Sequence, residues 1–328
     1  MVELYTPLDR WILQVQHWHN DRRQRVGCRC CVLGALMLSV KEAFQKFRSR
    51  LELTEREQSD ASRRQKEIRG YMDECFHIDR DFLTGSYKRW TKTKPLKDVD
   101  IFCVLGEDER HYRAKHPSAL LGAVESKLVE KYGRDSVKCQ RRSVSVNFDV
   151  AGQEERILSF DVVPAYDKDH HYEIPDTNRQ SGWTDTDPEI HAEKATDANK
   201  AYSGEWKGMV RMIKRWNVEK DKPVRPSFFL EVMALDLLRP PFGGDYPYEF
   251  QALFASAAAR IHDEWQEPAK LGPPVSDLMS TSDKDQARIA LQQASDSVRE
   301  AINLSRQGQN SEALKAYRRL FGDLFPLS

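Results

Sequence analysis

Three aspartates are spaced so that they could hold metal ions together. Asp98 and Asp100 lie at the start of the apolar segment 99–105, and Asp161 interrupts a second apolar segment, 158–163. Residues i and i+2 of a strand share one face, roughly 6.5–7 Å apart, so Asp98 and Asp100 can reach the same cation. If the strand of Asp161 lies beside that of Asp100, the three carboxylates meet at one point of a sheet. Carboxylate oxygens suit Mg²⁺, and a pair of such ions can promote phosphoryl or nucleotidyl transfer.

A Gly-Ser pair upstream of these aspartates could bind phosphate. Gly85 lets the backbone approach a phosphate closely, and the Ser86 hydroxyl can donate a hydrogen bond to a phosphate oxygen. Basic residues follow the pair: Lys88, Arg89, Lys92, Lys94 and Lys97. An Asp-x-Asp pair alone is a weak signal, because most such pairs are solvated strand ends, and Asp79 and Asp81 form another one. The joint order of strand, Gly-Ser, Asp-x-Asp and later aspartate is much more specific.

Hydrophobic periodicity predicts the strands and helices that must position these residues. Strands are predicted over 79–84, 99–105, 143–150 and 156–163. Helices are predicted from residue 38, from a capping box at Thr54 and Glu57, and over 117–131, 205–216, 227–238, 248–266, 283–308 and 311–322. The polar, proline-containing segment 164–200 is predicted to be a long irregular loop. The pattern is that of an α+β lobe followed by a helical lobe.

Composition limits the class of protein. The chain has 328 residues, which favours two coupled lobes, predicted as 37–204 and 205–328, after an N-terminal extension, 1–36, that is either disordered or a mis-annotated start. The 51 basic residues balance the 51 acidic ones, so constitutive binding of duplex nucleic acid is disfavoured. No apolar run reaches the roughly 18 residues of a membrane-spanning helix. Six cysteines do not form a disulfide framework, so we expect a cytoplasmic chain that does not associate with membranes.

The residues around the aspartates resemble a known signature. Segments 82–87 and 97–101 resemble the nucleotidyltransferase signature of the DNA polymerase β superfamily, and are most similar to the bacterial cGAS-like enzymes, the CD-NTases. The resemblance implies a polymerase β-like lobe with a mixed sheet, flanking helices and a long N-terminal spine helix. It also implies a C-terminal helical lobe and an active site in the cleft between the lobes. Asp98, Asp100 and Asp161 would then be catalytic and hold two Mg²⁺ ions, which Mn²⁺ can replace.

The predicted start of the second lobe resembles a nucleotide-binding helix. Residues 206–216 are similar to the helix that opens the second lobe of oligoadenylate synthases, where the Arg and Lys of an R-x-x-K-x-W pattern hold the donor triphosphate. The matching residues are Arg211 and Lys214, which share one helical face at i, i+3, and Lys207 precedes them on the same helix. The alternative interpretation is that these cations form an ordinary solvated helix face.

The next helix start resembles a second part of that nucleotide site. The resemblance implies that Ser227 supplies a phosphate-binding hydroxyl and that Phe228 stacks on the base. A hydroxyl at a helix N-terminus suits an anion, and an aromatic ring suits base stacking. Phe228 could instead belong to the core, and Glu231 is predicted to lie on the helix surface. Segment 183–188 also looks like the loop that these bacterial enzymes carry after the third aspartate.

The resemblance implies an enzyme that joins NTPs into a cyclic di- or trinucleotide and releases pyrophosphate. The product would be a second messenger in anti-phage defence (CBASS). ATP is the expected substrate, with the second base undetermined. A HORMA-type protein is the suggested regulator, and the product rather than the enzyme would bind the downstream effector. Two alternatives stay open: a nucleotidyltransferase that modifies tRNA, a drug or a protein, and an inactive nucleotide-binding scaffold.

Overall fold

The structure is a computed structural model that describes residues 38–150 and 153–328. Its seven-stranded sheet has the order β1-β2-β5-β4-β3, with β6 paired to β5 and β7 paired to β6. The strands are β1 Ile78–Thr84, β2 Asp98–Leu105, β3 Val137–Cys139, β4 Val144–Val150, β5 Gln153–Lys168, β6 His171–Pro175 and β7 Trp183–Thr186. β2 and β5 are parallel and their other neighbours are antiparallel, so the predicted mixed sheet is confirmed. The predicted extension, 1–36, lies outside the described residues.

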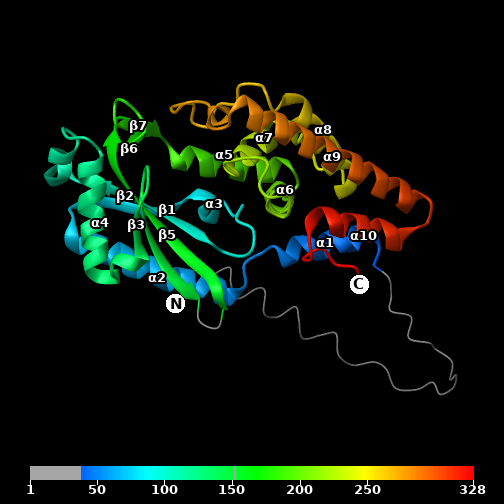
Figure 1. The fold of residues 1–328 in the computed structure, drawn as a ribbon, viewed down its shortest axis with the longest axis horizontal. Helices are drawn as coiled ribbons and strands as arrows, with labels where there is room; N and C mark the ends of the chain where they lie inside the picture. Colours follow the sequence, from blue (N-terminus) through cyan, green and yellow to red (C-terminus); the bar gives the residue numbers. More distant parts are fainter. Residues whose placement is uncertain (1–37, 151–152) are drawn as a thin grey trace, which may run out of the picture. The chain divides into compact units, whose positions relative to one another are not determined.

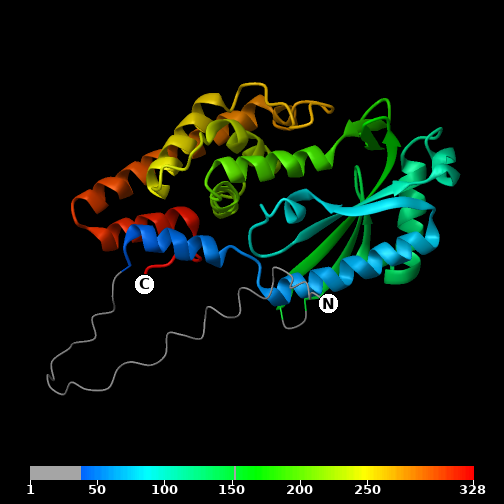
Figure 2. The same cartoon turned by 180° about the vertical axis from the view of Figure 1, so that it is seen from behind.

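Helices cover the sheet and build a second core (Figures 1 and 2). The α-helices are α1 Val40–Arg50, α2 Glu55–Cys75, α3 Gly85–Lys88, α4 Ser118–Tyr132, α5 Pro188–Ala201, α6 Trp206–Glu219, α7 Phe228–Leu237, α8 Tyr246–Arg260, α9 Thr281–Arg306 and α10 Asn310–Phe321. Short 3₁₀ helices are η2 Glu107–Tyr112, η3 Arg134–Ser136 and η4 Val275–Leu278. α2 and α4 pack on the sheet, whereas α1 and α5 to α10 share the second core. The predicted α+β architecture is confirmed.

Strand alternation divides the central sheet into a covered face and a second face. Val99 and Ile101 of β2 and Phe160 of β5 point into the core formed with α2 and α4. Since alternate side chains point to opposite faces, Asp100 and Asp161 lie on the face away from those two helices. The apolar residues that surround the aspartates in sequence therefore also set their direction.

Helix caps explain where the predicted helices begin. The Thr54 and Glu57 capping box is present at the start of α2. At α9 the cap is Ser280, which makes a capping box with Asp283. Asp283, predicted as the cap itself, is instead the third residue of the helix, because its carboxylate binds back to the Ser280 backbone. This shift leaves the predicted helix in place.

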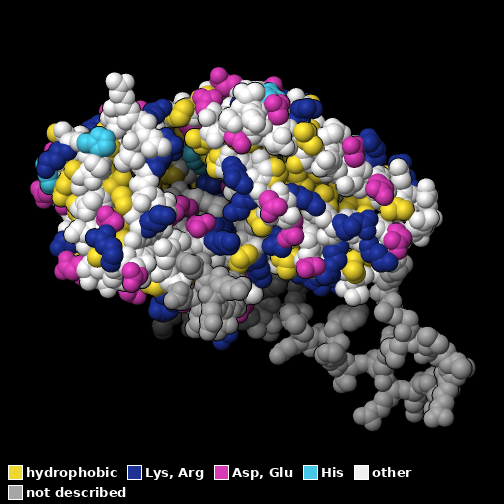
Figure 3. Space-filling model, viewed as in Figure 1, with side chains coloured by type: hydrophobic (Ala, Val, Ile, Leu, Met, Phe, Trp, Pro, Cys, Tyr) yellow, Lys and Arg dark blue, Asp and Glu magenta, His cyan; other side chains and the backbone are white. Residues whose placement is uncertain are grey.

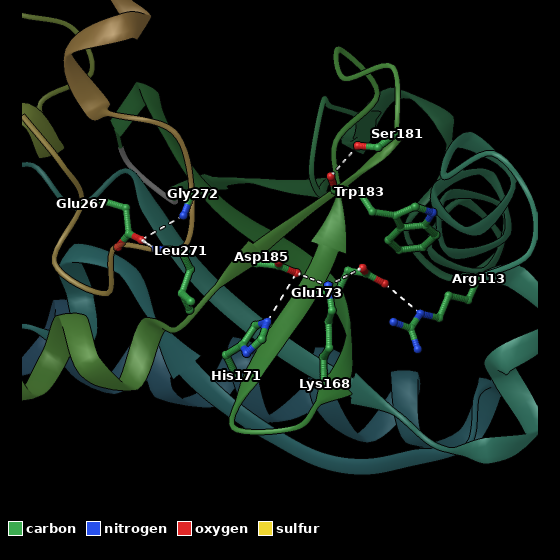
Figure 4. Close-up of polar contacts among 10 residues, drawn as sticks. All are labelled: Arg113, Lys168, His171, Glu173, Ser181, Trp183, Asp185, Glu267, Leu271 and Gly272. Carbon is green, nitrogen blue, oxygen red and sulfur yellow. Dashed lines mark hydrogen bonds and ion pairs between the residues drawn. The ribbon is translucent and has the colours of Figure 1, made fainter. Parts of the chain in front are cut away.

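Residues 164–200 do not form the predicted irregular loop. They contain the end of β5, then β6, β7 and α5. The polar side chains that suggested a loop form ordered ion pairs (Figure 4). Lys168 Nζ donates to Glu173 Oε1 at 3.2 Å and to Asp185 Oδ1 at 2.8 Å. Arg113 Nε donates to Glu173 Oε2 at 2.8 Å.

The start of α5 carries a signal that the loop prediction overlooked. The Asp187 side chain accepts hydrogen bonds from the N–H groups of Glu189 and Ile190 at 2.9 and 3.1 Å. Pro188 is the first residue of the helix. An Asp cap followed by proline is a standard helix start, so this pair is a sufficient reason to predict a helix here.

The division at residue 204 stays a prediction. Within the described residues, α1 and α5 belong by sequence to the predicted first lobe, yet both contribute side chains to the core that contains α6 to α10. None of the described helices combines the length and the hydropathy needed to cross a membrane.

Replacing Phe44 with alanine is expected to lower the free energy of unfolding by about 3–5 kcal/mol, because a fully buried aromatic ring is lost. The Phe44 ring is completely buried. It contacts Tyr246, Phe250, Tyr317, Phe321 and Phe325. Urea unfolding should be compared with Ile289→Ala at an exposed position, expected within about 0.5 kcal/mol of wild type. Equal effects of the two substitutions would contradict this core assignment.

Candidate active site

Two of the three aspartates lie side by side on the second face of the sheet. Thr84, Asp100 and Asp161 are register partners across β1, β2 and β5, and adjacent strands lie about 4.8 Å apart. Asp98 comes two positions before Asp100 and is paired in register with Ser159. The structure therefore brings the three predicted residues to one region of the sheet. Their catalytic and metal-binding roles remain predictions.

Gly85 lies directly against Asp100. Its φ of +65° is in the left-handed region, which glycine adopts readily. A Cβ atom at this position would lie 1.6 Å from Asp100 Oδ2 and 2.6 Å from Asp100 Cγ. Only a residue without a side chain therefore lets the turn after β1 approach this carboxylate so closely. Ser86 follows in the single turn of α3.

The environment of Asp100 and Asp161 disfavours two negative charges. Burial, and then the charge of Asp161, raise the pKa of Asp100 to about 6. Burial also raises the pKa of Asp161, although a hydrogen bond with Ser145 opposes this change. Gln140 Nε2 donates to Asp161 Oδ1 at 3.4 Å. A nearby cation would favour the ionised form of both groups.

The three aspartates are of the residue type that binds Mg²⁺. Within the described part of the chain, however, no three metal-ligating side chains are already arranged to hold an ion. Lys92 Nζ donates to Asp98 Oδ2 at 2.9 Å, so this carboxylate already has a cationic partner. Carboxylates that lack a shared cation also repel one another. Mg²⁺ prefers oxygen ligands of this type, and Asp98, Asp100 and Asp161 are the residues that would hold it.

Mg²⁺ is expected to raise the melting temperature more at pH 7.5 than at pH 5. Mg²⁺ binds the deprotonated carboxylate, and Asp100, whose pKa is about 6, is mostly protonated at pH 5. A ligand at about 100 times its Kd adds about 2.7 kcal/mol of stability. Thermal unfolding with MgCl₂ or with EDTA measures the shift at each pH. An equal shift at both pH values, or an unchanged shift in Asp100→Asn, would contradict the assignment.

A pocket of about 340 Å³ lies beside Asp98 and Ser86. Its basic lining residues are Lys92, Lys94, Lys97, Lys214, Lys222 and Arg225. Among its described lining residues Asp98 is the single acid, and Ser86 and Ser227 supply hydroxyl groups. Figure 3 shows Lys and Arg side chains gathered in the middle of the face drawn, between the strands and the helices. Charge-assisted hydrogen bonds from such a lining suit a polyphosphate.

Two of the three candidate cations of α6, Arg211 and Lys214, are buried and do not lie on a solvated face, whereas Lys207 is half-buried. Lys214 is buried and borders the basic pocket. Arg211 is also buried, and its guanidinium donates to the Trp90 carbonyl and to Glu52 Oε1, both at 2.8 Å. It borders a neighbouring pocket of about 240 Å³, and Lys207 borders neither pocket. Lys214 and Arg211 thus lie on one helix but border different pockets. Lys214 is held by Glu231, whereas Arg211 is held by Trp90 and Glu52.

Ser227 and Phe228 lie at the start of α7, as predicted. Ser227 is the N-cap residue, is exposed, makes no side-chain capping hydrogen bond and borders the basic pocket. Phe228 is partly buried against the helical core. Its ring centroid lies 4.9 Å from the Arg89 guanidinium and 5.3 Å from the His191 ring. Phe228 therefore packs partly on the core, and its stacking role stays a prediction.

The prediction that Glu231 lies on the helix surface is wrong. Glu231 is 2% exposed, and its carboxylate accepts hydrogen bonds from Arg89, Thr91 and Lys214. The sequence of α7, FFLEVMALDL, contains a signal for this position. A helix that is apolar on nearly all sides is buried, so an acid among these residues needs partners inside the protein.

Comparisons with known proteins give a matching domain family and similar proteins. Residues 38–199 match the model of the Second Messenger Oligonucleotide or Dinucleotide Synthetase domain. A probable cyclic nucleotide synthase of Bacillus cereus (strain VD146) is 26% identical, over 74% of this chain and 81% of that protein. The cyclic AMP-AMP-AMP synthase of an Acinetobacter species is 27% identical, over 75% of this chain and 73% of that protein.

A solved structure shares the fold at lower identity. The structure of Escherichia coli MS115-1 CdnC with ATP has a TM-score of 0.67 and 19% identity, and the match covers 88% of this chain and 99% of CdnC. CdnC has also been solved in a complex with a HORMA protein. The fold match extends over the strands and the helices alike, beyond the segment covered by the domain model.

Proposed function

We propose that this chain, which belongs to the bacterial cGAS-like nucleotidyltransferases (the CD-NTases), carries out its reaction where the aspartates meet the basic pocket. The CD-NTases are metal-dependent enzymes that build cyclic oligonucleotides. The observation that carries this proposal is the side-by-side register of Asp100 and Asp161 beside the Gly85 turn. It puts two carboxylates next to a turn whose backbone could approach a phosphate closely.

In the proposed mechanism Asp161 orients the acceptor ribose hydroxyl and accepts its proton at a carboxylate oxygen. Burial raises the pKa of Asp161, which makes the carboxylate a better base. The acceptor oxygen attacks the α-phosphorus of the donor NTP in line, and pyrophosphate leaves. Asp98 and Asp100 would hold Mg²⁺ together with Asp161, and two such ions, when bound, neutralise charge on the phosphates. Positioning and charge neutralisation account for most of the rate.

The donor triphosphate is proposed to occupy the basic pocket. Ser86 and Ser227 can donate hydrogen bonds to phosphate oxygens, and Lys214 can supply positive charge at the pocket wall. Arg211 and Lys207 remain candidates for a second contact once a nucleotide is bound. Phe228 is proposed to contact the base.

The substrates and partners are proposed from the relatives. The name of the Acinetobacter relative supports ATP as a substrate and a trinucleotide as the product. The HORMA complex of CdnC supports a HORMA-type regulator for this chain. A role in CBASS, an effector that binds the product, and a cytoplasmic location are consistent with this proposal and remain predictions.

Incubating the purified chain with labelled NTPs and Mg²⁺, followed by phosphatase, tests the proposed function. We expect a phosphatase-resistant product, which mass spectrometry would identify as a cyclic oligonucleotide. EDTA should prevent its formation. Label transferred instead to added tRNA, drug or protein would support the rival acceptor, and the absence of any product or transfer with every NTP would support an inactive scaffold.

A further inference from the structure

A buried cluster of charges connects the segment after the Gly-Ser turn to the second core. Arg89 Nε and Nη2 donate to the two carboxylate oxygens of Glu231, each at 3.0 Å. Thr91 Oγ1 donates to Glu231 at 2.8 Å, and Lys214 Nζ donates to the same carboxylate. The side chains of Glu231, Arg89 and Lys214 are only 2%, 8% and 6% exposed. Glu231 thus holds two cations from different parts of the fold.

A contribution to the stability of the fold does not by itself explain why these charges are buried together. Removing three charged groups from water costs several kcal/mol per ion, and well-packed apolar residues are often as stable. The position of the cluster is more informative. Lys214 borders the basic pocket, and Arg89 follows Ser86 closely in sequence and is near enough to Asp100 to lower its pKa. Of the two cations held by Glu231, Lys214 therefore borders the basic pocket, and Arg89 lies near the aspartates.

We propose that Glu231 is a positioning residue for the donor triphosphate. Glu231 holds the Lys214 ammonium at the pocket wall and fixes the side chain of Arg89, which follows the Gly-Ser turn in sequence. This inference rests on the proposed function, because it assigns the pocket to the triphosphate. Glu231 itself does not line the pocket, so it acts through Lys214 and Arg89 and not by contact with the nucleotide.

The charges around Lys214 predict how nucleotide binding should depend on pH if Glu231 has this role. Burial lowers the pKa of Lys214, and Glu231 opposes this effect, whereas Arg89 and Lys92 lower the pKa further. Although burial alone would raise the pKa of Glu231, the charges of Arg89 and Lys214 hold it well below its usual range. Without the Glu231 charge, Lys214 would lose its proton more easily as the pH rises, and the pocket would lose a positive charge.

Binding of a non-hydrolysable ATP analogue with Mg²⁺, measured by calorimetry from pH 7 to pH 8.5, tests the proposal. Glu231→Gln is expected to raise the Kd by about 10- to 100-fold, the loss typical of a charge-assisted contact. The Kd should rise with pH more steeply than in wild type. Glu219→Gln is the matched control on α6, where Glu219 pairs with Arg215, and it should bind like wild type at every pH.

A second comparison keeps the test valid if Glu231→Gln alone does not fold, because the double variant with Lys214→Met removes both members of the buried Lys214–Glu231 pair. Lys214→Met should raise the Kd, and adding Glu231→Gln to Lys214→Met should raise it further by less than about 10-fold, because only the part of the effect that passes through Arg89 is left. A wild-type Kd and pH profile in Glu231→Gln, or fully multiplied effects in the double variant, would overturn this inference alone. Failure of the wild-type chain to bind the analogue would overturn the proposed function and, with it, this inference.

Discussion

Asp100→Asn is expected to reduce product formation by at least about 10³-fold, the scale of loss when a group that stabilises transition-state charge is removed. Asparagine keeps the shape of the side chain but cannot supply the negative charge that a divalent cation requires. The register of Asp100 with Asp161 makes this position central to the site. Initial rates of cyclic product formation with saturating Mg²⁺ and NTPs measure the effect.

The same substitution should not destabilise the protein. Burial and Asp161 raise the pKa of Asp100 to about 6, above its unfolded value near 4. The charge of Asp100 therefore lowers stability as the pH rises from about 4 to about 6, and at pH 7 its removal should leave the unfolding free energy equal or higher. Asp79→Asn is the matched control, because Asp79 belongs to the other Asp-x-Asp pair and is 58% exposed. A fully active Asp100→Asn enzyme would refute the assignment of this carboxylate.

Gly85→Ala is expected to lower the rate by about 10²-fold or more, because a displacement near 1 Å in an active site has that effect. The new Cβ would lie 1.6 Å from Asp100 Oδ2, so either the turn or the carboxylate must move. The φ of +65° adds backbone strain for any residue with a side chain. The assay is the same product measurement, together with thermal unfolding to establish that the variant is folded.

Gly70→Ala provides the control for this substitution. A Cβ at Gly70, inside α2, would meet no atom within 4 Å apart from the backbone of its own helix and its chain neighbours. Alanine favours a helix interior over glycine by about 1 kcal/mol, so Gly70→Ala should be fully active and slightly more stable. If Gly85→Ala matched it in activity, the close approach of the turn to Asp100 would have no functional role.

The sequence was sufficient for features that depend on local periodicity. Alternation in β2 and β5 places the aspartates away from the apolar core, and a strand's period of two does not depend on the rest of the fold. The capping box of Thr54 and Glu57 is local in the same way. The parallel pairing of β2 with β5 is not local. From the sequence, the neighbouring position of these two strands was only a condition for the site, and the direction of their pairing was not predicted.

Features that depend on distant partners could not be predicted in the same way. The ion pairs that organise β6 and β7 join residues such as Lys168 and Asp185, whose meeting depends on strand pairing. Glu231 accepts a hydrogen bond from Arg89, which lies 142 positions away in the sequence. Arg211 and Lys214 share a helical face, but their partners direct them to different pockets. Helical spacing alone could not reveal those partners.

Asp98, Asp100 and Asp161 are proposed to converge on divalent cations beside the donor triphosphate. The decisive experiment is a crystal structure with Mn²⁺ and a non-hydrolysable ATP analogue, in which anomalous scattering locates the metal. We expect manganese peaks about 2.0–2.4 Å from oxygens of all three carboxylates, with the triphosphate in the basic pocket. If the analogue binds but manganese does not bind at these aspartates, or if any of the three lies more than about 10 Å from the metal positions, the proposed metal site is wrong.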